Sequence, residues 1–365
     1  MKLGKLEAIR GFAAVYVVIY HFVGFTVLQD KFPAIAKLLF RFGQEAVILF
    51  FLLSGFVIYL SVATKPDTSF KKFFLKRLVR IYPILIISFI LSIVIGITAN
   101  YHFAKEDLKE LAGNLFMLQD VNILGKPGLI VKVFMNNDPL WSLSYEWWFY
   151  MLFYPLFFYL IKKGHVKIEQ SMYAVLLLSV IGWLSFLVFP NHMLLVLSYF
   201  TLWWAGAACA EIYLKYGTFT FKELKPVIIS LSVMTVFMTI PVITRYLHHG
   251  KLLFIMYPLL TLRHYAFSLI VIFAGLLWWK AKLVGFDVTL GFFERFSKIS
   301  YAIYVIHFPF IALKLPYIDN IYASVAIKLV LIFILAYLLE IKLQSVINGW
   351  VFKKKKRPAP ILAPG

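Results

Sequence analysis

Two ionisable residues in the first apolar segment have a spacing that places them on one face of a helix. Arg10 and His21 are eleven residues apart, which is about three helical turns and about 16 Å along the axis. An imidazole titrates near neutral pH and can act as a general base, while a guanidinium can stabilise developing negative charge. Arg10 could equally be a cationic anchor at the end of the segment, and His21 could be a neutral ring bonded to a neighbouring helix.

A carboxylate on a later apolar segment could complete this arrangement. Glu146 lies in the run Trp141-Ser142-Leu143-Ser144-Tyr145-Glu146, about 10 Å below the outer end of its helix and close to the depth of His21. A carboxylate that accepts a proton from one imidazole nitrogen fixes the tautomer and leaves the other nitrogen free to deprotonate a hydroxyl. We therefore predict a His21–Glu146 dyad, and a catalytic set of His21, Glu146 and Arg10.

A basic cluster between two apolar segments could bind an anion. Arg77 and Arg80 are three residues apart, so they point to one side of a helical turn. The planar guanidinium group suits phosphate, and we predict that Arg77 and Arg80, with Lys76 and Tyr82, bind a phosphorylated cosubstrate. Anchoring on the cytoplasmic side, or contact with lipid headgroups, is the simpler explanation of the charge by itself.

Six further residues on apolar segments are candidates for contact with an acceptor molecule. They are Trp141, Ser142, Tyr145, Arg263, His264 and His307. The aromatic residues could instead form an interfacial belt, Arg263 and His264 could neutralise Glu146, and His307 could make a structural bond. No P-loop, GxSxG, HExxH or cysteine-rich metal pattern occurs, so we expect no metal cofactor and no ATP-driven step.

The composition indicates that a membrane surrounds these residues. Of 365 residues, 62% are hydrophobic and only 15% are charged, whereas a soluble domain carries roughly 25% charged residues. The net charge of +20 comes from short Lys and Arg clusters between apolar runs, which favours topology signals over a nucleic-acid-binding face. The single cysteine, Cys209, cannot form an intramolecular disulfide, and it has no nearby base in sequence that would make it a nucleophile.

Apolar runs long enough to cross a bilayer alternate with these clusters. They cover about residues 8–28, 46–64, 81–99, 139–161, 172–189, 193–214, 226–244, 257–279, 298–315 and 322–341. Lys and Arg are concentrated in alternate loops, which predicts that both termini are cytoplasmic. We expect an all-α polytopic membrane protein of about ten transmembrane helices, with a single domain over 1–350 and a basic, Pro-rich cytoplasmic tail over 351–365.

Five motifs occur in a fixed order along the chain. They are Leu6-Glu7-Ala8-Ile9-Arg10-Gly11 with His21, Phe50–Phe56, Lys76–Pro83, Trp141–Glu146 and Ser300–His307. Together they resemble acyltransferase family 3, the polytopic enzymes that acylate bacterial surface polysaccharides and related acceptors. The resemblance implies that Arg10 and His21 are essential to transfer. It also implies that Arg77 and Arg80 belong to a motif associated with the acyl donor, and that Glu146 is functional.

The presence of one acidic residue rather than two after the Trp-Ser-Leu-Ser run is similar to the exopolysaccharide-type branch of that family. We expect an O-acetyltransferase of the bacterial inner membrane that uses cytoplasmic acetyl-CoA, by direct transfer or through an acyl-enzyme. The expected partners are a glycan or glycolipid acceptor and the lipid bilayer, with polysaccharide assembly proteins as possible further partners and no nucleic acid. A transporter for polysaccharide or lipid-linked glycan is the main alternative, because the same buried charges would line a path. A receptor or scaffold is the third.

Overall fold

The chain forms a bundle of long helices in this computed structural model, which describes residues 3–26, 28–31, 33, 34, 36, 41–64, 69–121 and 125–352. The long helices are α1 (Leu3–Gly24), α4 (Gly43–Ala63), α5 (Phe70–Thr98), α7 (Trp141–Leu156), α8 (Ile168–Val188), α9 (His192–Tyr216), α10 (Phe221–His249), α11 (Leu259–Lys280), α13 (Ser300–Ala312) and α14 (Ile321–Tyr337). The shorter ones are α2 (Leu28–Lys31), α6 (Lys105–Leu115), η1 (Phe134–Asn136), η2 (Asp138–Leu140), η3 (Phe157–Lys163), α12 (Phe286–Thr289), η4 (Gly291–Ile299), η5 (Leu338–Leu343) and α15 (Gln344–Val351). Two short parallel strands, β1 (Gln119–Asp120) and β2 (Val131–Lys132), pair in the connection between α5 and α7.

The helices confirm an all-α polytopic membrane protein. Within the described ranges, eight helices are long and apolar enough to cross a membrane. Each of the ten predicted spans coincides with a helix, but α7 and α13, which correspond to 139–161 and 298–315, are outside those eight. The thirteen residues of α13 extend about 20 Å, which is less than the thickness of a bilayer core.

The sides of the membrane on which the termini lie stay a prediction, as does the single domain over 1–350. Of the predicted tail, residues 353–365 lie outside the described part of the chain.

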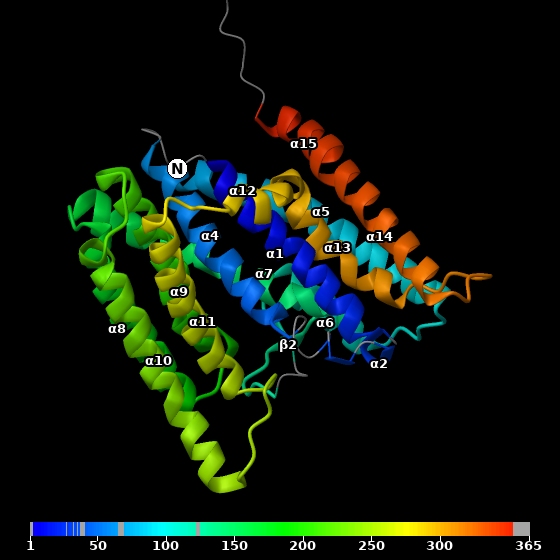
Figure 1. Cartoon of the computed structure of the whole chain (residues 1–365). Helices are drawn as coiled ribbons and strands as arrows, with labels where there is room; N and C mark the ends of the chain where they lie inside the picture. The colour runs from blue at the N-terminus through cyan, green and yellow to red at the C-terminus, as the bar shows by residue number, and fades with distance from the viewer. Residues whose placement is uncertain are drawn as a thin grey trace, which may run out of the picture.

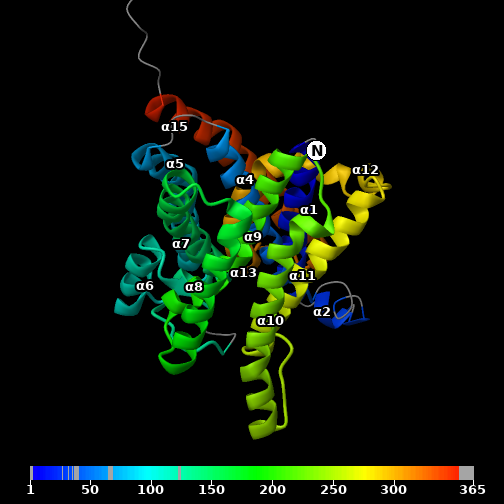
Figure 2. The same cartoon turned by 90° about the vertical axis from the view of Figure 1, so that its left-hand side faces the viewer.

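The helices that carry the candidate residues meet near the middle of the bundle. Figure 1 shows α8, α10 and α11 on one side and α5, α13 and α14 on the other, with α1 and α4 between them. Helix α4 packs against α1 and α9, and α13 packs against α1, α5 and α14. The segment from α6 to η2 covers the beginning of α7, and Figure 2 shows α6 beside that helix. Residues far apart in the sequence are therefore brought to one interior region.

Two glycines allow α4 and α9 to pack with their backbones in contact. A Cβ atom added at Gly55 would lie 1.9 Å from the carbonyl oxygen of Trp203, and one added at Gly206 would lie 1.9 Å from that of Leu52. A side chain at either position would force the two helices apart, because a filled interior cannot absorb such an overlap. The close packing also sets the position of Ser54, which accepts a hydrogen bond from Trp203 Nε1 at 3.2 Å.

The substitution Gly206→Ala should therefore destabilise the protein by about 1–3 kcal/mol, which is the usual cost of overpacking a well-packed interior. The measurement is the melting temperature of the purified protein in detergent. Gly349→Ala is the matched control, since that helical glycine has open space around it. An equal change in melting temperature for the two variants would contradict the packing argument.

Candidate active site

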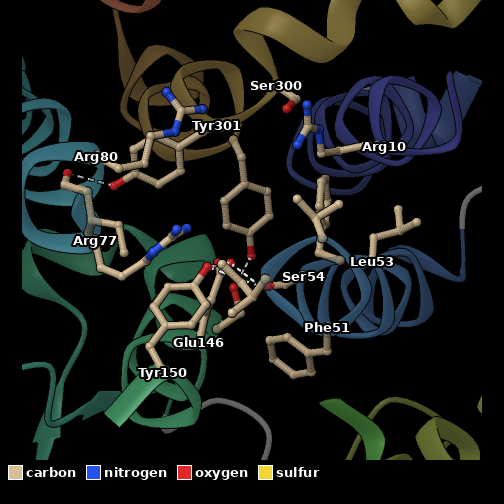
Figure 3. A pocket seen from close by; sticks show the side chains of 16 residues that line it. Arg10, Phe51, Leu53, Ser54, Arg77, Arg80, Glu146, Tyr150, Ser300 and Tyr301 are labelled. Atoms are coloured by element: carbon tan, nitrogen blue, oxygen red, sulfur yellow. Dashed lines mark hydrogen bonds between the residues drawn. The ribbon is translucent and has the colours of Figure 1, made fainter. Parts of the chain in front are cut away.

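A cavity with a volume of about 860 Å³ lies between α1, α4, α5, α7 and α13. Its lining consists of Arg10, Phe50, Phe51, Leu53, Ser54, Val57, Ile58, Arg77, Arg80, Ile81, Ser142, Glu146, Tyr150, Ser300, Tyr301 and Tyr304. Figure 3 shows Arg10 reaching it from α1 on one side, and Arg77 from α5 on the other. The tertiary structure thus brings all three predicted arginines together with Glu146.

A second hollow of about 760 Å³ adjoins this cavity between α1 and α4. It shares Arg10, Leu53 and Val57 with the first, and Glu7, Ser61 and Thr64 add polar groups to it. Arg10 therefore stands where the two hollows meet.

The three arginines differ in how their charges are compensated. Arg80 forms an ion pair with Glu340 of η5, and a second contact joins Arg80 Nη2 to Glu340 Oε1 at 3.0 Å. Arg77 is held between the rings of Phe73 and Tyr150, at 5.4 and 5.6 Å from their centroids. The Nε atoms of Arg10 and Arg77 are buried and have no hydrogen-bond partner. These two guanidinium groups therefore retain buried donors that an anionic or carbonyl ligand could satisfy.

Glu146 is held in the cavity by hydroxyl groups. Its Oε1 atom accepts hydrogen bonds from Ser54 Oγ at 2.9 Å and from the hydroxyl of Tyr150. Because Ser54 is itself bonded to Trp203 on α9, this carboxylate has a fixed orientation. The Glu146 carboxylate also attracts the guanidinium groups of Arg10 and Arg77.

The lining of the cavity carries more positive than negative charge. Arg10, Arg77 and Arg80 contribute three positive groups, against the single carboxylate of Glu146. Two carboxylates outside the lining offset part of this charge: Glu340 behind Arg80, and Glu7 near Arg10 in the adjoining hollow. Electrostatic attraction inside such an enclosure is much stronger than in water. The cavity is suited to a ligand that carries negative charge or develops it during reaction.

The predicted pairing of His21 with Glu146 is wrong. His21 Nδ1 lies 2.9 Å from His307 Nε2, whereas Glu146 bonds to Ser54 and Tyr150. The reason is tertiary: α1 packs against α13 and α4, so the face of α1 that carries His21 meets α13 before it can reach α7. His21 is 8% exposed and contacts the rings of Tyr20, Phe25 and Phe308 besides that of His307.

Tyr304 stands between the cavity and this histidine pair. It lines the cavity, and its ring centroid lies 6.2 Å from that of His307. Its hydroxyl group is 2.7 Å from Ser142 Oγ and donates to the Pro139 carbonyl at 2.8 Å. The Tyr304 ring and the His307 imidazole therefore lie between His21 and the cavity that holds the arginines.

Two of the predicted cosubstrate-binding residues lie outside the cavity lining. Lys76 and Tyr82 are on α5 with Arg77 and Arg80, but a helix turns about 100° per residue and directs them elsewhere. The Tyr82 hydroxyl donates to the Leu115 carbonyl at 2.8 Å, so this side chain holds α6 rather than joining the arginines.

The predicted acceptor-binding residues do not form one site. Of the six, Ser142 alone lines the cavity. Arg263 forms an ion pair with Glu45, so the suggestion that it neutralises Glu146 is wrong. His264 is fully buried, with Nδ1 at 2.8 Å from the hydroxyl of Tyr199.

Trp141 and Tyr145 belong instead to a buried polar cluster beside the beginning of α7. Lys126 Nζ lies 4.4 Å from the centroid of the Trp141 ring and 3.3 Å from Asp120 Oδ1. Asp120 Oδ2 accepts from the Tyr145 hydroxyl at 2.9 Å and is 3.2 Å from His192 Nδ1. Burial alone would raise the pKa of Asp120, but Lys126 and His192 hold it below its ordinary value. The cluster fixes the connection before α7 and, through it, the helix that carries Glu146.

Asp138, just before α7, should make the stability of the folded protein depend on pH. Burial raises its pKa to about 6, above the value of about 3.9 in an unfolded chain. The folded state then binds the proton more tightly, so stability from this group is largest below about pH 4 and is lost as the pH rises through 6. Asp138→Asn should raise the free energy of unfolding at pH 7.5 by at most about 3 kcal/mol, and the melting temperature should rise with it. The gain should shrink at pH 4, and a gain independent of pH would contradict the assignment.

Several lining residues were not predicted as site residues. Ser54, Tyr301 and Tyr304 lie in two of the five motifs, which was the signal that could have identified them. Tyr150 in the lining, and Glu340 behind Arg80, have no such signal, because their roles depend on helices that meet only in the folded chain. Within the ranges that the structure describes, no group of three His, Cys, Asp or Glu side chains is arranged to bind a metal ion.

The fold and the cavity define a polytopic membrane protein with an arginine-lined interior site. Residues 3–341 match the family described as "Acyltransferase domain", and the chain belongs to this family, acyltransferase family 3. A similar protein is the acyltransferase MdmB from Streptomyces mycarofaciens, which is 32% identical over 174 residues. That match covers 46% of this chain and 42% of the length of the relative. No solved structure matches the chain.

Proposed function

We propose that this protein is an O-acetyltransferase of the bacterial inner membrane, which moves the acetyl group of cytoplasmic acetyl-CoA to a hydroxyl of a cell-surface or exported glycan. The observation that carries the proposal is the pair of buried, unpartnered Nε donors of Arg10 and Arg77 in one cavity with Glu146. Membership of the acyltransferase family supports transfer rather than transport as the activity.

In this proposal the donor enters through the hollow between α1 and α4 and lies along the arginines. Arg77 and Arg80 hold phosphate groups of the coenzyme, because guanidinium groups bind phosphate through parallel hydrogen bonds. Arg10, where the two hollows meet, stabilises the negative charge that develops on the thioester oxygen. Glu146 keeps the arginines and the Ser54 and Tyr150 hydroxyls in fixed positions.

The His21 imidazole is the proposed base. It accepts the proton of the acceptor hydroxyl as that oxygen attacks the thioester carbonyl carbon. A C–O bond forms, the C–S bond breaks, and the proton passes from His21 to the thiolate sulfur, so an ester and the free thiol are the products. For the acetyl group and the His21 ring to meet, the Tyr304 ring has to leave its position against Ser142 and Pro139, and the acceptor hydroxyl has to approach the His21 ring on the side away from His307.

The test is incubation of membranes that contain the protein with acetyl-CoA labelled in the acetyl group. Label should appear in glycan and should be lost with Arg10→Ala. Arg295→Ala is the matched control, since Arg295 is an exposed arginine outside the cavity. Mass spectrometry of surface glycans with and without the protein should locate the added acetyl group. Movement of glycan across the membrane without acylation would contradict the proposal.

A further inference from the structure

We propose that His307 is a positioning residue that holds His21 in the tautomer with its proton on Nδ1, so that Nε2 is free to accept a proton. The inference rests on the proposed role of His21 as the base and adds a residue that acts through it. It comes from a chain of three groups: the Ile303 carbonyl, the His307 ring and the His21 ring.

The direction of each hydrogen bond follows from the group at the end of the chain. His307 Nδ1 lies 3.0 Å from the carbonyl oxygen of Ile303, and a carbonyl oxygen only accepts, so His307 Nδ1 carries the proton. In a neutral imidazole the other nitrogen then has a lone pair, which makes His307 Nε2 an acceptor. His21 Nδ1, at 2.9 Å from it, must be the donor, and the backbone carbonyl of Val17, one turn earlier on α1, is a further acceptor beside the His21 ring. His21 Nε2 is left with the lone pair.

The surroundings of the pair hold it in this state. His307 is fully buried on the short helix α13. The preceding turn of this helix carries Tyr304, whose hydroxyl is bonded to Ser142 and Pro139. The rings around the pair, from Tyr20, Phe25, Phe308 and Tyr304, provide aromatic faces and edges. When His21 Nε2 takes a proton, its Nδ1–H becomes a stronger donor to His307, which stabilises the imidazolium. The proton taken up at Nε2 lies on the side of the His21 ring away from His307, so it remains available for the leaving group.

The tautomer can be measured directly in the absence of substrate. Histidine labelled with ¹⁵N gives distinct signals for protonated and unprotonated ring nitrogens, and the signals of His21 are identified by their loss in His21→Gln. The wild-type protein should show His21 protonated on Nδ1. His307→Gln places an amide oxygen near the position of Nε2 and should keep this tautomer. His307→Leu removes the imidazole acceptor and leaves the Val17 carbonyl, so it should lower the fraction of His21 in this tautomer.

Transfer activity should follow the tautomer. His307→Leu should lower kcat by about tenfold to a hundredfold, the loss expected when a buried donor loses its acceptor. It should also move the acidic limb of the kcat–pH profile to lower pH, because the imidazolium is no longer stabilised. His307→Gln should recover most of the rate and the wild-type pH profile. Phe310→Leu, which shortens another buried ring on α13, controls for packing and should leave the pH profile unchanged.

The inference is overturned if His21 of the wild-type protein is protonated on Nε2, a result that needs no variant to fold. It is also overturned if His307→Leu keeps both the tautomer and the rate. The inference and the proposed function can fail separately. A proton on Nδ1 without acylation of any glycan refutes the proposed function alone, whereas a proton on Nε2 with normal acylation refutes the role of His307 alone.

Discussion

Replacing His21 by alanine is expected to lower kcat for acetyl transfer by about 10²–10⁴, the usual contribution of a general base. The fold should be retained, because His21 bonds to one side chain, His307, and the rest of its surroundings is aromatic packing. The KM for the donor should change little, since His21 does not line the cavity that holds the arginines. The measurement is steady-state transfer of labelled acetyl groups by the purified protein in detergent.

Val18→Ala is the matched control for this variant. Val18 is buried on the same helix, so its truncation removes packing from α1 without removing a proton acceptor. It should lower the melting temperature by about as much as His21→Ala while leaving kcat close to the wild-type value. Transfer at the normal rate by purified His21→Ala would eliminate the proposed role of the imidazole.

The second large effect is expected at Arg77, in donor binding rather than in stability. Arg77→Gln removes a buried cation whose Nε atom has no partner within the protein. It loses ring contacts with Phe73 and Tyr150 and attraction to Glu146 but no ion pair of the kind that Arg80 makes, so it should cost less stability than Arg80→Gln. The donor loses charge-assisted hydrogen bonds worth about 1.5–3 kcal/mol, which corresponds to an increase in the KM for acetyl-CoA of about 10- to 100-fold. Arg77→Lys keeps the charge but loses the planar fork, and should recover only part of the affinity.

Arg80→Gln gives a contrasting result, because Arg80 is the ion-pair partner of Glu340. The Glu340 side chain is 1% exposed, so its carboxylate would be left buried without its cation. We expect this variant to lose about 1–3 kcal/mol of stability, the cost of a buried polar group that loses its partner. Arg77→Gln therefore tests donor affinity with little change in stability, whereas Arg80→Gln should lower both stability and donor affinity. An unchanged KM for acetyl-CoA in Arg77→Gln would remove Arg77 from the donor site.

The sequence was sufficient to predict an all-α polytopic membrane protein and the shared position of two arginines on one side of a helix. Runs of about 20 apolar residues are typical of membrane-spanning helices. Each of the ten predicted spans overlaps a helix, and in the described part of the chain eight helices are long and apolar enough to cross a membrane. Arg77 and Arg80 lie on one side of α5, as their spacing requires, because helical periodicity is a local property of the chain. The presence of Arg10 in the same cavity agrees with its prediction as a site residue.

Contacts between helices could not be obtained in the same way. Depth along a helix indicated that His21 and Glu146 lie at a similar level, but depth does not determine which helix lies beside which. The packing of α13 against α1 gives His21 a second imidazole as its partner and leaves Glu146 to Ser54 and Tyr150. Arg263 likewise pairs with Glu45, not with the carboxylate suggested for it.

The residue types, their order and their positions along each helix are therefore properties of the sequence by itself. The pairing of buried polar groups was decided by the tertiary structure. The physical reason is that a buried donor or acceptor must find a partner among the side chains that neighbouring helices bring within about 3 Å. Close packing between helices, such as that of Gly55 and Gly206 between α4 and α9, determines which side chains are neighbours. These contacts join residues that are far apart in the sequence, so a local sequence pattern does not predict them.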